Sequence, residues 1–255
     1  MNKYKIILFL FAFISLSTSQ INTESIRKNN SSEGIFNTIN IDFDYDNADN
    51  NEIFNINFGY RLDFIQSGFN TFMKLNYENG YNKTDGATNT IEDKGFCHIR
   101  YTKDIKSKIL FLETFAQYEF NDFLNIKDRY LLGIGTRIKF DTKKNNSIFL
   151  GIGLMNEKEI YELELEDNKN LIRSTNYLSN STKINDNVTL SNIIYFQLDI
   201  GDANDYRILY DSSINVGTIK NLSLNFAINY RYDNDPHGDS SQSYTQLSSG
   251  IEYEF

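Results

Sequence analysis

Strict alternation between apolar and polar or small side chains runs through Leu222-Ser223-Leu224-Asn225-Phe226-Ala227-Ile228-Asn229-Tyr230-Arg231-Tyr232. The same period runs through Phe54-Asn55-Ile56-Asn57-Phe58-Gly59-Tyr60-Arg61-Leu62-Asp63-Phe64. A period of two is typical of a β-strand with one apolar face and one polar face. Each stretch has 11 residues. That is long for a soluble sheet and matches the roughly 9 to 11 residues that a tilted strand needs to cross a bilayer.

Similar segments recur along the rest of the chain. They centre on residues 35–45, 53–64, 70–82, 91–103, 108–120, 129–140, 147–161, 171–182, 188–200, 205–218, 221–232 and 243–255. Their even number is typical of bacterial outer-membrane barrels. We therefore predict an all-β fold, a closed antiparallel transmembrane β-barrel of about 12 strands, over residues 34–255. The register is least defined near residues 91–103 and 147–182, because polar residues there fall on both faces.

The connections between these segments fall into a short set and a long set. The short turns lie at residues 66–69, 104–107, 141–146, 183–187 and 220–221. The longer loops are expected at residues 46–52, 83–90, 121–129, 164–170, 201–205 and 233–241. Outer-membrane barrels place short turns in the periplasm and long loops outside the cell, so the asymmetry gives the predicted barrel an orientation.

Composition agrees with an all-β chain and excludes several classes of function. Aromatic residues make up 15 % of the chain and there is one Pro, a balance that favours strands. A single Cys excludes an internal disulfide, a thiolate zinc site and an iron–sulfur cluster, and two His leave little room for another metal centre. We expect no metal and no other cofactor. The net charge of −9 argues against nucleic acid as a partner.

The N-terminus has the layout of a secretory signal. Lys3 and Lys5 precede the apolar run Ile6–Ile14, and small residues follow up to Gln20. We predict a signal peptide at residues 1–20, a short N-terminal periplasmic segment at residues 21–33, and a location in the bacterial outer membrane. An uncleaved anchor is the alternative. The expected partners are the lipid bilayer, lipopolysaccharide and, during insertion, the barrel-assembly machinery.

The C-terminus resembles the insertion signal of bacterial outer-membrane barrels, which alternates apolar residues and ends on an aromatic one. Ile251, Tyr253 and Phe255 carry this pattern in Ile251-Glu252-Tyr253-Glu254-Phe255. We predict that these three residues form the membrane-insertion signal.

Charged residues collect on the predicted inner face of the strands. They are Arg61, Asp63, Glu113, Glu119, Arg137, Lys139, Asp199, Arg207, Asp211, Arg231, Glu252 and Glu254. One interpretation is a network of cross-strand salt bridges that fills the lumen. The other is a narrow hydrated pore, which would mildly prefer cations because the acids in this set outnumber the bases seven to five.

The enzyme alternative is an outer-membrane lipid hydrolase, which would need a Ser and a His close together. His98 is followed two residues later by Arg100, and His237 lies near Ser240 in an acidic loop. The chain has no nucleophile-elbow, metalloprotease or phosphate-loop motif. We therefore predict a non-enzymatic envelope barrel with a structural or narrow-pore role.

A soluble secreted β-sandwich that binds a ligand remains a third alternative, because alternation alone does not tell an apolar core from an apolar outer surface.

Two stretches are similar to the YdiY-like family of unknown function, whose members are described as salt-induced outer membrane proteins. One is Phe115-Ala116-Gln117-Tyr118-Glu119-Phe120 with Arg129-Tyr130-Leu131-Leu132-Gly133-Ile134-Gly135. The other is Tyr230-Arg231-Tyr232-Asp233-Asn234-Asp235-Pro236 with the last strand, which ends in Phe255. The resemblance covers residues 34–255. It implies an outer-membrane barrel and a salt or osmotic response, and it brings no catalytic residues.

Overall fold

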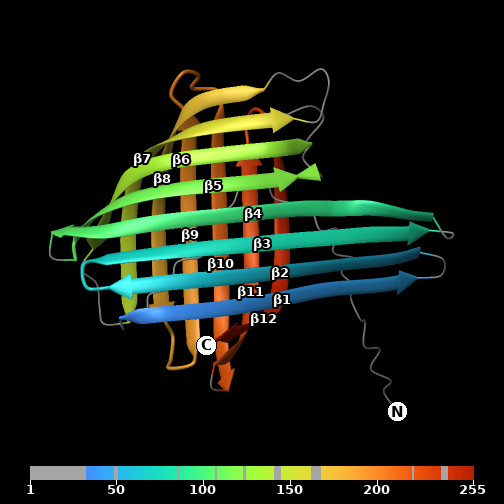
Figure 1. Cartoon of the computed structure of the whole chain (residues 1–255), viewed down its shortest axis with the longest axis horizontal. Coiled ribbons are helices and arrows are strands. Elements are labelled where there is room, and N and C mark those ends of the chain that lie inside the picture. Colours follow the sequence, from blue (N-terminus) through green and yellow to red (C-terminus); the bar gives the residue numbers. More distant parts are fainter. Residues whose placement is uncertain are drawn as a thin grey trace, which may run out of the picture.

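The computed structural model describes residues 33–48, 51–84, 87–106, 108–122, 125–140, 145–161, 168–219, 221–236 and 241–255. These residues form one closed barrel of twelve strands (Figure 1). The strands are β1 (Gly34–Ala48), β2 (Asn51–Gln66), β3 (Phe69–Thr84), β4 (Ala87–Lys106), β5 (Leu110–Asn121), β6 (Ile126–Phe140), β7 (Asn146–Tyr161), β8 (Lys169–Lys183), β9 (Val188–Asp199), β10 (Tyr206–Ile219), β11 (Leu222–Asp233) and β12 (Ser243–Glu254).

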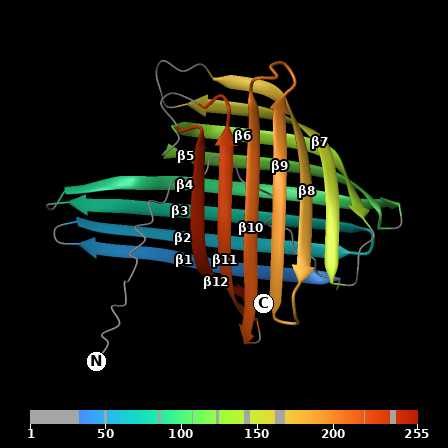
Figure 2. The same ribbon diagram turned by 180° about the vertical axis from the view of Figure 1, so that it is seen from behind.

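Each strand pairs antiparallel with its neighbours in the sequence, and β12 returns to pair with β1. The strands of the front wall cross those of the back wall steeply (Figures 1 and 2), as expected when strands tilt strongly against the barrel axis. The predicted all-β barrel of twelve strands is therefore confirmed. The two regions of undefined register are paired as well, with Cys97 opposite Tyr118 and Ile152 opposite Asn176. The β3–β4 register shifts at Ile91, which lies between Thr90 opposite Tyr81 and Glu92 opposite Gly80.

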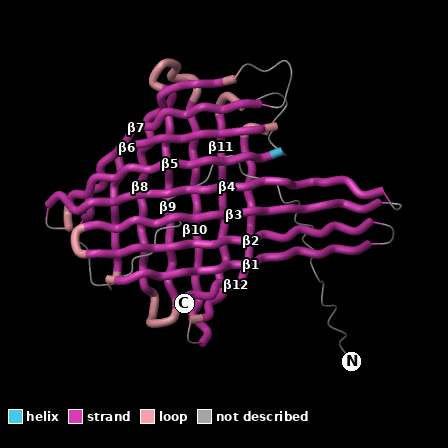
Figure 3. Tube along the Cα trace, viewed as in Figure 1, coloured by secondary structure: helices cyan, strands magenta, loops and turns pink. Residues whose placement is uncertain are grey.

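The prediction of long loops at residues 46–52 and 83–90 is wrong. Pairing continues to Ala48 opposite Asn51 and to Thr84 opposite Ala87, so two residues remain between the strands at each place. In one of them the two residues are Asp85-Gly86, a sequence that favours a two-residue hairpin. Strands β1 to β4 consequently extend past the neighbouring strands on this side (Figure 3). We call the end of the barrel with the odd-to-even connections the outer end and the opposite end the periplasmic end, after the orientation that the sequence predicts.

The outer surface of the wall is apolar and the inner surface is polar. Exposed large apolar side chains cover every strand and include Ile41, Phe58, Ile99, Leu132, Ile134, Ile152, Leu154, Ile194, Phe226, Ile228 and Ile251. An apolar surface that surrounds the whole barrel is typical of membrane-spanning barrels and is not tolerated in water. The soluble sandwich is therefore wrong, since it would bury these side chains in a shared core.

Some sequence predictions fall outside the described residues. These are the signal peptide at residues 1–20, nearly all of the segment at residues 21–33, and both His237 and Ser240. Among the residues that are described, no helix is long and apolar enough to cross a membrane.

The charged lumen as candidate functional site

A cluster of charged side chains occupies the lumen near its outer end. We call it the outer-mouth cluster, and its members lie near the ends of strands that lead into the odd-to-even connections. They are Glu119, Arg129, Glu157, Glu159, Arg173, Asp205, Arg207 and Asp233, with Lys169 and Asp235 at its rim. The cluster assembles because alternation points these positions inward from six strands (β5, β6, β7, β8, β10 and β11), and two connections supply Asp205 and Asp235.

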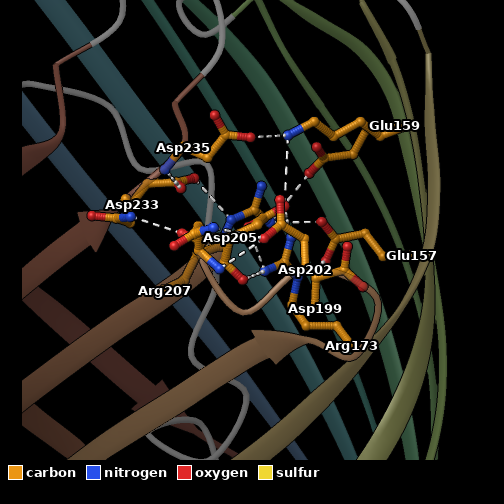
Figure 4. Close-up of polar contacts among 12 residues, drawn as sticks. Glu157, Glu159, Arg173, Asp199, Asp202, Asp205, Arg207, Asp233 and Asp235 are labelled. Atoms are coloured by element: carbon orange, nitrogen blue, oxygen red, sulfur yellow. Dashed lines mark hydrogen bonds and ion pairs between the residues drawn. The ribbon is translucent and has the colours of Figure 1, made fainter.

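Glu157 is the centre of this cluster. Its carboxylate lies 2.6 Å from the Arg207 guanidinium, 3.2 Å from that of Arg129 and 3.4 Å from that of Arg173. Figure 4 shows Arg173 and Arg207 beside Glu157. The side chains of Glu157 and Arg173 are completely buried, and those of Arg129 and Arg207 are 2 % exposed. One carboxylate therefore holds three arginines that come from three different strands.

Two further glutamates complete the inner part of the cluster. Glu159 lies 2.9 Å from Arg129 and 3.5 Å from Arg207, and it accepts a hydrogen bond from the Tyr161 hydroxyl. Glu119 lies 3.6 Å from Arg129. Arg129 and Arg207 thus each have at least two acidic partners, which offset the cost of removing their charges from water.

Three aspartates of the outer connections and strand ends complete the outer part of the cluster. Asp205 accepts two hydrogen bonds from the Arg173 guanidinium, at 2.8 and 3.1 Å. Asp233 lies 2.8 Å from Arg207, and Asp235 lies 2.8 Å from Lys169. Burial alone would raise the pKa of Asp205. The hydrogen bonds from Arg173 and the charges of Arg173, Arg207 and Lys169 outweigh it and lower the pKa below its ordinary value of 3.8.

The lowered pKa of Asp205 predicts a loss of stability in acid. A carboxylate whose pKa is depressed by folding contributes stability above its unfolded pKa and loses it as the pH falls through the folded pKa. We expect the melting temperature of the folded barrel to fall when the pH drops below 3.8. The Asp205→Asn variant should show less of this fall, measured as melting curves at a series of pH values. An equal fall in both proteins would contradict the assignment.

A second set of charges lies deeper in the lumen, toward the periplasmic end. Glu113 lies 3.5 Å from Arg100 and 3.8 Å from Arg137, and its Oε2 accepts a hydrogen bond of 2.9 Å from the hydroxyl of Tyr177. Because Tyr177 belongs to β8 and Glu113 to β5, this bond spans the lumen across two intervening strands. The Arg137 guanidinium also lies 3.5 Å from the centre of the Phe149 ring, a cation–π contact.

Two local ion pairs lie elsewhere on the inner wall. Arg61 pairs with Asp63 along β2, and Arg231 of β11 pairs with Asp211 of β10. The Arg61 guanidinium also lies over the Phe72 ring, 4.3 Å from its centre. Arg61 and Arg137 are therefore each held by a carboxylate and by an aromatic face.

His98 is buried in an aromatic environment. Its ring lies between those of Phe72, Phe96 and Phe115, with ring centres 5.6, 6.2 and 5.8 Å away. Its Nδ1 lies 3.2 Å from Oε1 of Gln117. These neighbours pack and orient the imidazole, and none of them is a hydroxyl nucleophile of the kind a hydrolase needs.

Glycines on the inner wall make room for the large side chains of neighbouring strands. The Tyr177 ring occupies the place where a Cβ on Gly151 would lie. We expect Gly151→Ala to displace this ring, weaken its bond to Glu113 and cost about 1–3 kcal/mol of unfolding free energy. The measurement is urea unfolding of the folded barrel in phosphatidylcholine vesicles. Gly217→Ala is the matched control, because its Cβ would meet nothing closer than 3.6 Å. Equal stability of the two variants would contradict the close fit.

The structure brings many of the sequence-predicted lumen residues into ion pairs. Those in ion pairs are Arg61, Asp63, Glu113, Glu119, Arg137, Arg207, Asp211 and Arg231. Lys139 is exposed at the periplasmic end, and Asp199 accepts a hydrogen bond from the backbone N–H of Gly201. Glu252 and Glu254 are half-buried on β12.

Sequence reasoning missed several members of the outer-mouth cluster. They are Arg129, Glu157, Glu159, Arg173 and Asp205. Two signals could have found them. Arg129 lies an even number of residues from Arg137 on the same strand, so both side chains face the same side of the wall. Glu157 and Glu159 are two residues apart and therefore also share a face. Within the described part of the chain, no group of His, Cys, Asp and Glu is arranged to hold a metal ion.

Comparisons with known proteins identify structures of similar fold. A search of curated proteins finds no significant match. Solved structures with a similar fold include the translocator domain of the autotransporter NalP from Neisseria meningitidis, at 11 % identity and TM-score 0.56, covering 91 % of this chain and 92 % of that one. A Pseudomonas putida F1 outer membrane channel has 8 % identity and TM-score 0.53, covering 88 % and 96 %. The NanC porin has 8 % identity and TM-score 0.51, covering 86 % and 98 %. At these identities the likeness concerns the fold.

The family comparison covers most of the chain. The model of DUF481, described as a protein of unknown function, matches residues 47–255. This range includes the whole outer-mouth cluster, the inner charges and the C-terminal strand. The chain belongs to the DUF481 family.

Proposed function

We propose that the protein is a non-enzymatic barrel of the bacterial outer membrane whose lumen is closed at its outer end by the outer-mouth cluster. The observation that carries this proposal is the burial of Arg129, Arg173 and Arg207 around Glu157. In an open aqueous channel such arginines would be hydrated and exposed. The function that fits is a structural envelope barrel that conducts small ions at most.

The energetics of buried charge support this proposal. Each buried ion costs several kcal/mol to desolvate, and the cost is recovered only where the partners are close and numerous. The cluster supplies at least two acidic partners for each arginine, from strands on different parts of the wall. Such a network joins β5, β6, β7, β8 and β10 across the lumen and stiffens the outer end of the barrel.

The proposal includes how the protein reaches the outer membrane and what surrounds it there. Residues 1–20 serve as the export signal, the barrel-assembly machinery inserts the chain, and lipopolysaccharide and the bilayer surround the apolar outer wall. The YdiY-like resemblance implies a salt or osmotic response, which supplies a growth condition for a test. We therefore propose high salt as the condition under which a strain lacking the protein should be compared with its parent.

Cell fractionation tests the proposed location. The protein should be found in the outer-membrane fraction, and its folded form should migrate differently on a gel before and after boiling. A soluble periplasmic protein without a heat-dependent shift would overturn the proposal.

Any residual ion leak should prefer cations. The outer-mouth cluster contains six acids (Glu119, Glu157, Glu159, Asp205, Asp233 and Asp235) and four bases (Arg129, Lys169, Arg173 and Arg207). A constriction with an excess of carboxylates favours cations over anions. The measurement is the reversal potential across a planar bilayer under a potassium chloride gradient. A reversal potential on the anion side would contradict this expectation.

A further inference from the structure

The seam that closes the barrel is much shorter than any other strand pairing. The register between β1 and β12 runs over four residue pairs, from Thr38 opposite Glu254 to Ile41 opposite Ile251. Asn37 and Phe255 extend it with two backbone hydrogen bonds of 3.0 Å. Every other neighbouring pair of strands has a register of eleven to sixteen residue pairs. The closure of the barrel is therefore confined to one end of the two strands.

The paired part lies at the periplasmic end, and the two strands separate toward the outer end. Residues 42–48 of β1 pair with β2, and residues 243–250 of β12 pair with β11. The Asp42 side chain still lies against Gly250, but among the described residues no register joins these two segments to each other. Figure 2 shows β1 and β12 running apart from their shared end. The outer half of the seam thus presents two facing strand edges.

A strand edge at membrane depth needs hydrogen-bond partners for its backbone groups. Backbone N–H and C=O groups that face hydrocarbon without a hydrogen-bond partner cost several kcal/mol each, so open edges are found only beside water or other polar groups. The outer half of the seam must therefore meet polar chemistry from a molecule that also tolerates the surrounding acyl chains.

The two faces of the wall beside the seam match the two halves of an amphiphile. The outward face carries the exposed apolar side chains of Ile41, Leu247 and Ile251. The inward face carries two rows of hydrogen-bonded polar side chains, which we call the polar ladder. One row is Asp42, Asn57 and Asn76, and the other, nearer the outer end, is Asn55, Glu78 and Lys94.

The polar ladder has the chemistry of a site for hydroxyl groups. Asn57 donates to Asp42 at 3.3 Å and accepts from Asn76 at 2.8 Å. Asn55 donates to Glu78 at 2.9 Å, and Lys94 lies 2.9 Å from Glu78. Amides both donate to and accept from hydroxyls, and carboxylates accept hydrogen bonds from them. A phosphate would meet the like charges of Asp42 and Glu78, which outnumber Lys94, the one cation of the polar ladder.

We propose that the outer half of the β1–β12 seam binds a lipid of the outer leaflet that has a hydroxyl-rich headgroup. The headgroup lies on the polar ladder and satisfies the strand edges, and the acyl chains lie against Ile41, Leu247 and Ile251. This inference rests on the proposed outer-membrane location. The tests use protein that shows the heat-dependent gel shift, so a failed barrel and a failed seam are distinguishable.

Paired cysteines test the geometry of the seam in a Cys97→Ser background. A disulfide requires Cα atoms within about 7 Å. Ile39→Cys with Tyr253→Cys lies within the register and should cross-link under mild oxidation. Phe43→Cys with Ser249→Cys occupies the positions that would pair if the register continued, and it should stay reduced. Equal cross-linking of the two pairs would overturn the proposal. So would a disulfide-linked dimer of the single Ser249→Cys variant, because it would place a second copy at the seam.

Native mass spectrometry tests the occupant. The protein, in a dimethylamine-oxide detergent that carries no sugar, is offered a glucosyl diacylglycerol or a phosphatidylcholine with the same acyl chains. Only the glucosyl lipid should be retained. Asn57→Leu should weaken its binding about tenfold, as expected for the loss of one buried hydrogen-bonding group. Asn156→Leu, an exposed position on β7, is the matched control and should bind normally. Equal retention of both lipids, or no effect of Asn57→Leu, would overturn the proposal.

Discussion

Glu157→Gln should lower the unfolding free energy of the barrel by about 3–5 kcal/mol, because it removes one charge from a buried ionic network. The glutamine keeps the shape of the side chain and loses the carboxylate that faces Arg129, Arg173 and Arg207 at 3.2, 3.4 and 2.6 Å. Three buried guanidinium groups would then share fewer acids. Mutual repulsion and water entry should also open the outer mouth. The measurements are urea unfolding in phosphatidylcholine vesicles and conductance in planar bilayers.

Asp235→Asn is the matched control within the same cluster. The Asp235 side chain is 61 % exposed and faces Lys169 at 2.8 Å. An exposed ion pair contributes about 1 kcal/mol or less, so this variant should stay close to the wild type in stability and conductance. A double-mutant cycle of Glu157→Gln with Arg207→Gln should show strong coupling. A Glu157→Gln barrel as stable and as closed as the wild type would contradict the role given to the cluster.

Phe255→Ala should abolish most of the insertion of the protein into the outer membrane. Phe255 is exposed at the end of the chain, and its ring stacks on that of Tyr253 with centres 5.9 Å apart. Its backbone exchanges two hydrogen bonds with Asn37, beside the short β1–β12 register. Both the proposed recognition of the terminal aromatic and the closure of the seam depend on this strand. The measurement is the amount of heat-shifted protein in the outer-membrane fraction.

Two controls separate recognition from stability in that experiment. Phe226→Ala removes a similarly exposed aromatic side chain from the middle of β11, so it should leave most of the insertion intact. Purified Phe255→Ala should still refold into detergent, because the backbone bonds of residue 255 do not need the ring. Normal amounts of Phe255→Ala in the outer membrane would show that Ile251, Tyr253 and Phe255 do not form an insertion signal.

Alternation along single strands predicted the strands, and their length and even number favoured the barrel over a sandwich. The apolar residues of 54–64 and 222–232 face outward, and the twelve segments pair in sequence order. The connections were harder to predict, because a two-residue hairpin and a longer loop share the same polar composition. Asp85-Gly86 was a readable turn signal inside what was expected to be a loop of residues 83–90.

The candidate site could be predicted only in part. Parity along one strand assigns residues such as Arg137 and Arg207 to the lumen, but it does not say which side chains meet. Glu157 meets Arg207 because β7 and β10 face each other across the lumen, 50 residues apart in sequence. Such meetings depend on the tilt and register of the whole barrel. The short β1–β12 seam likewise has no signature in Ser243–Gly250, whose sequence is compatible with pairing on both edges.

The conductance of the wild-type protein in a planar bilayer tests the central claim most directly, namely that buried ion pairs close the outer end of the lumen. The protein should be purified from the outer membrane and shown to be folded by its heat-dependent gel shift. We predict a closed barrel, with no steady current steps beyond a small cation leak. Large, steady steps like those of an open water-filled pore would contradict the account, because the side chains around Glu157 would then have to be hydrated.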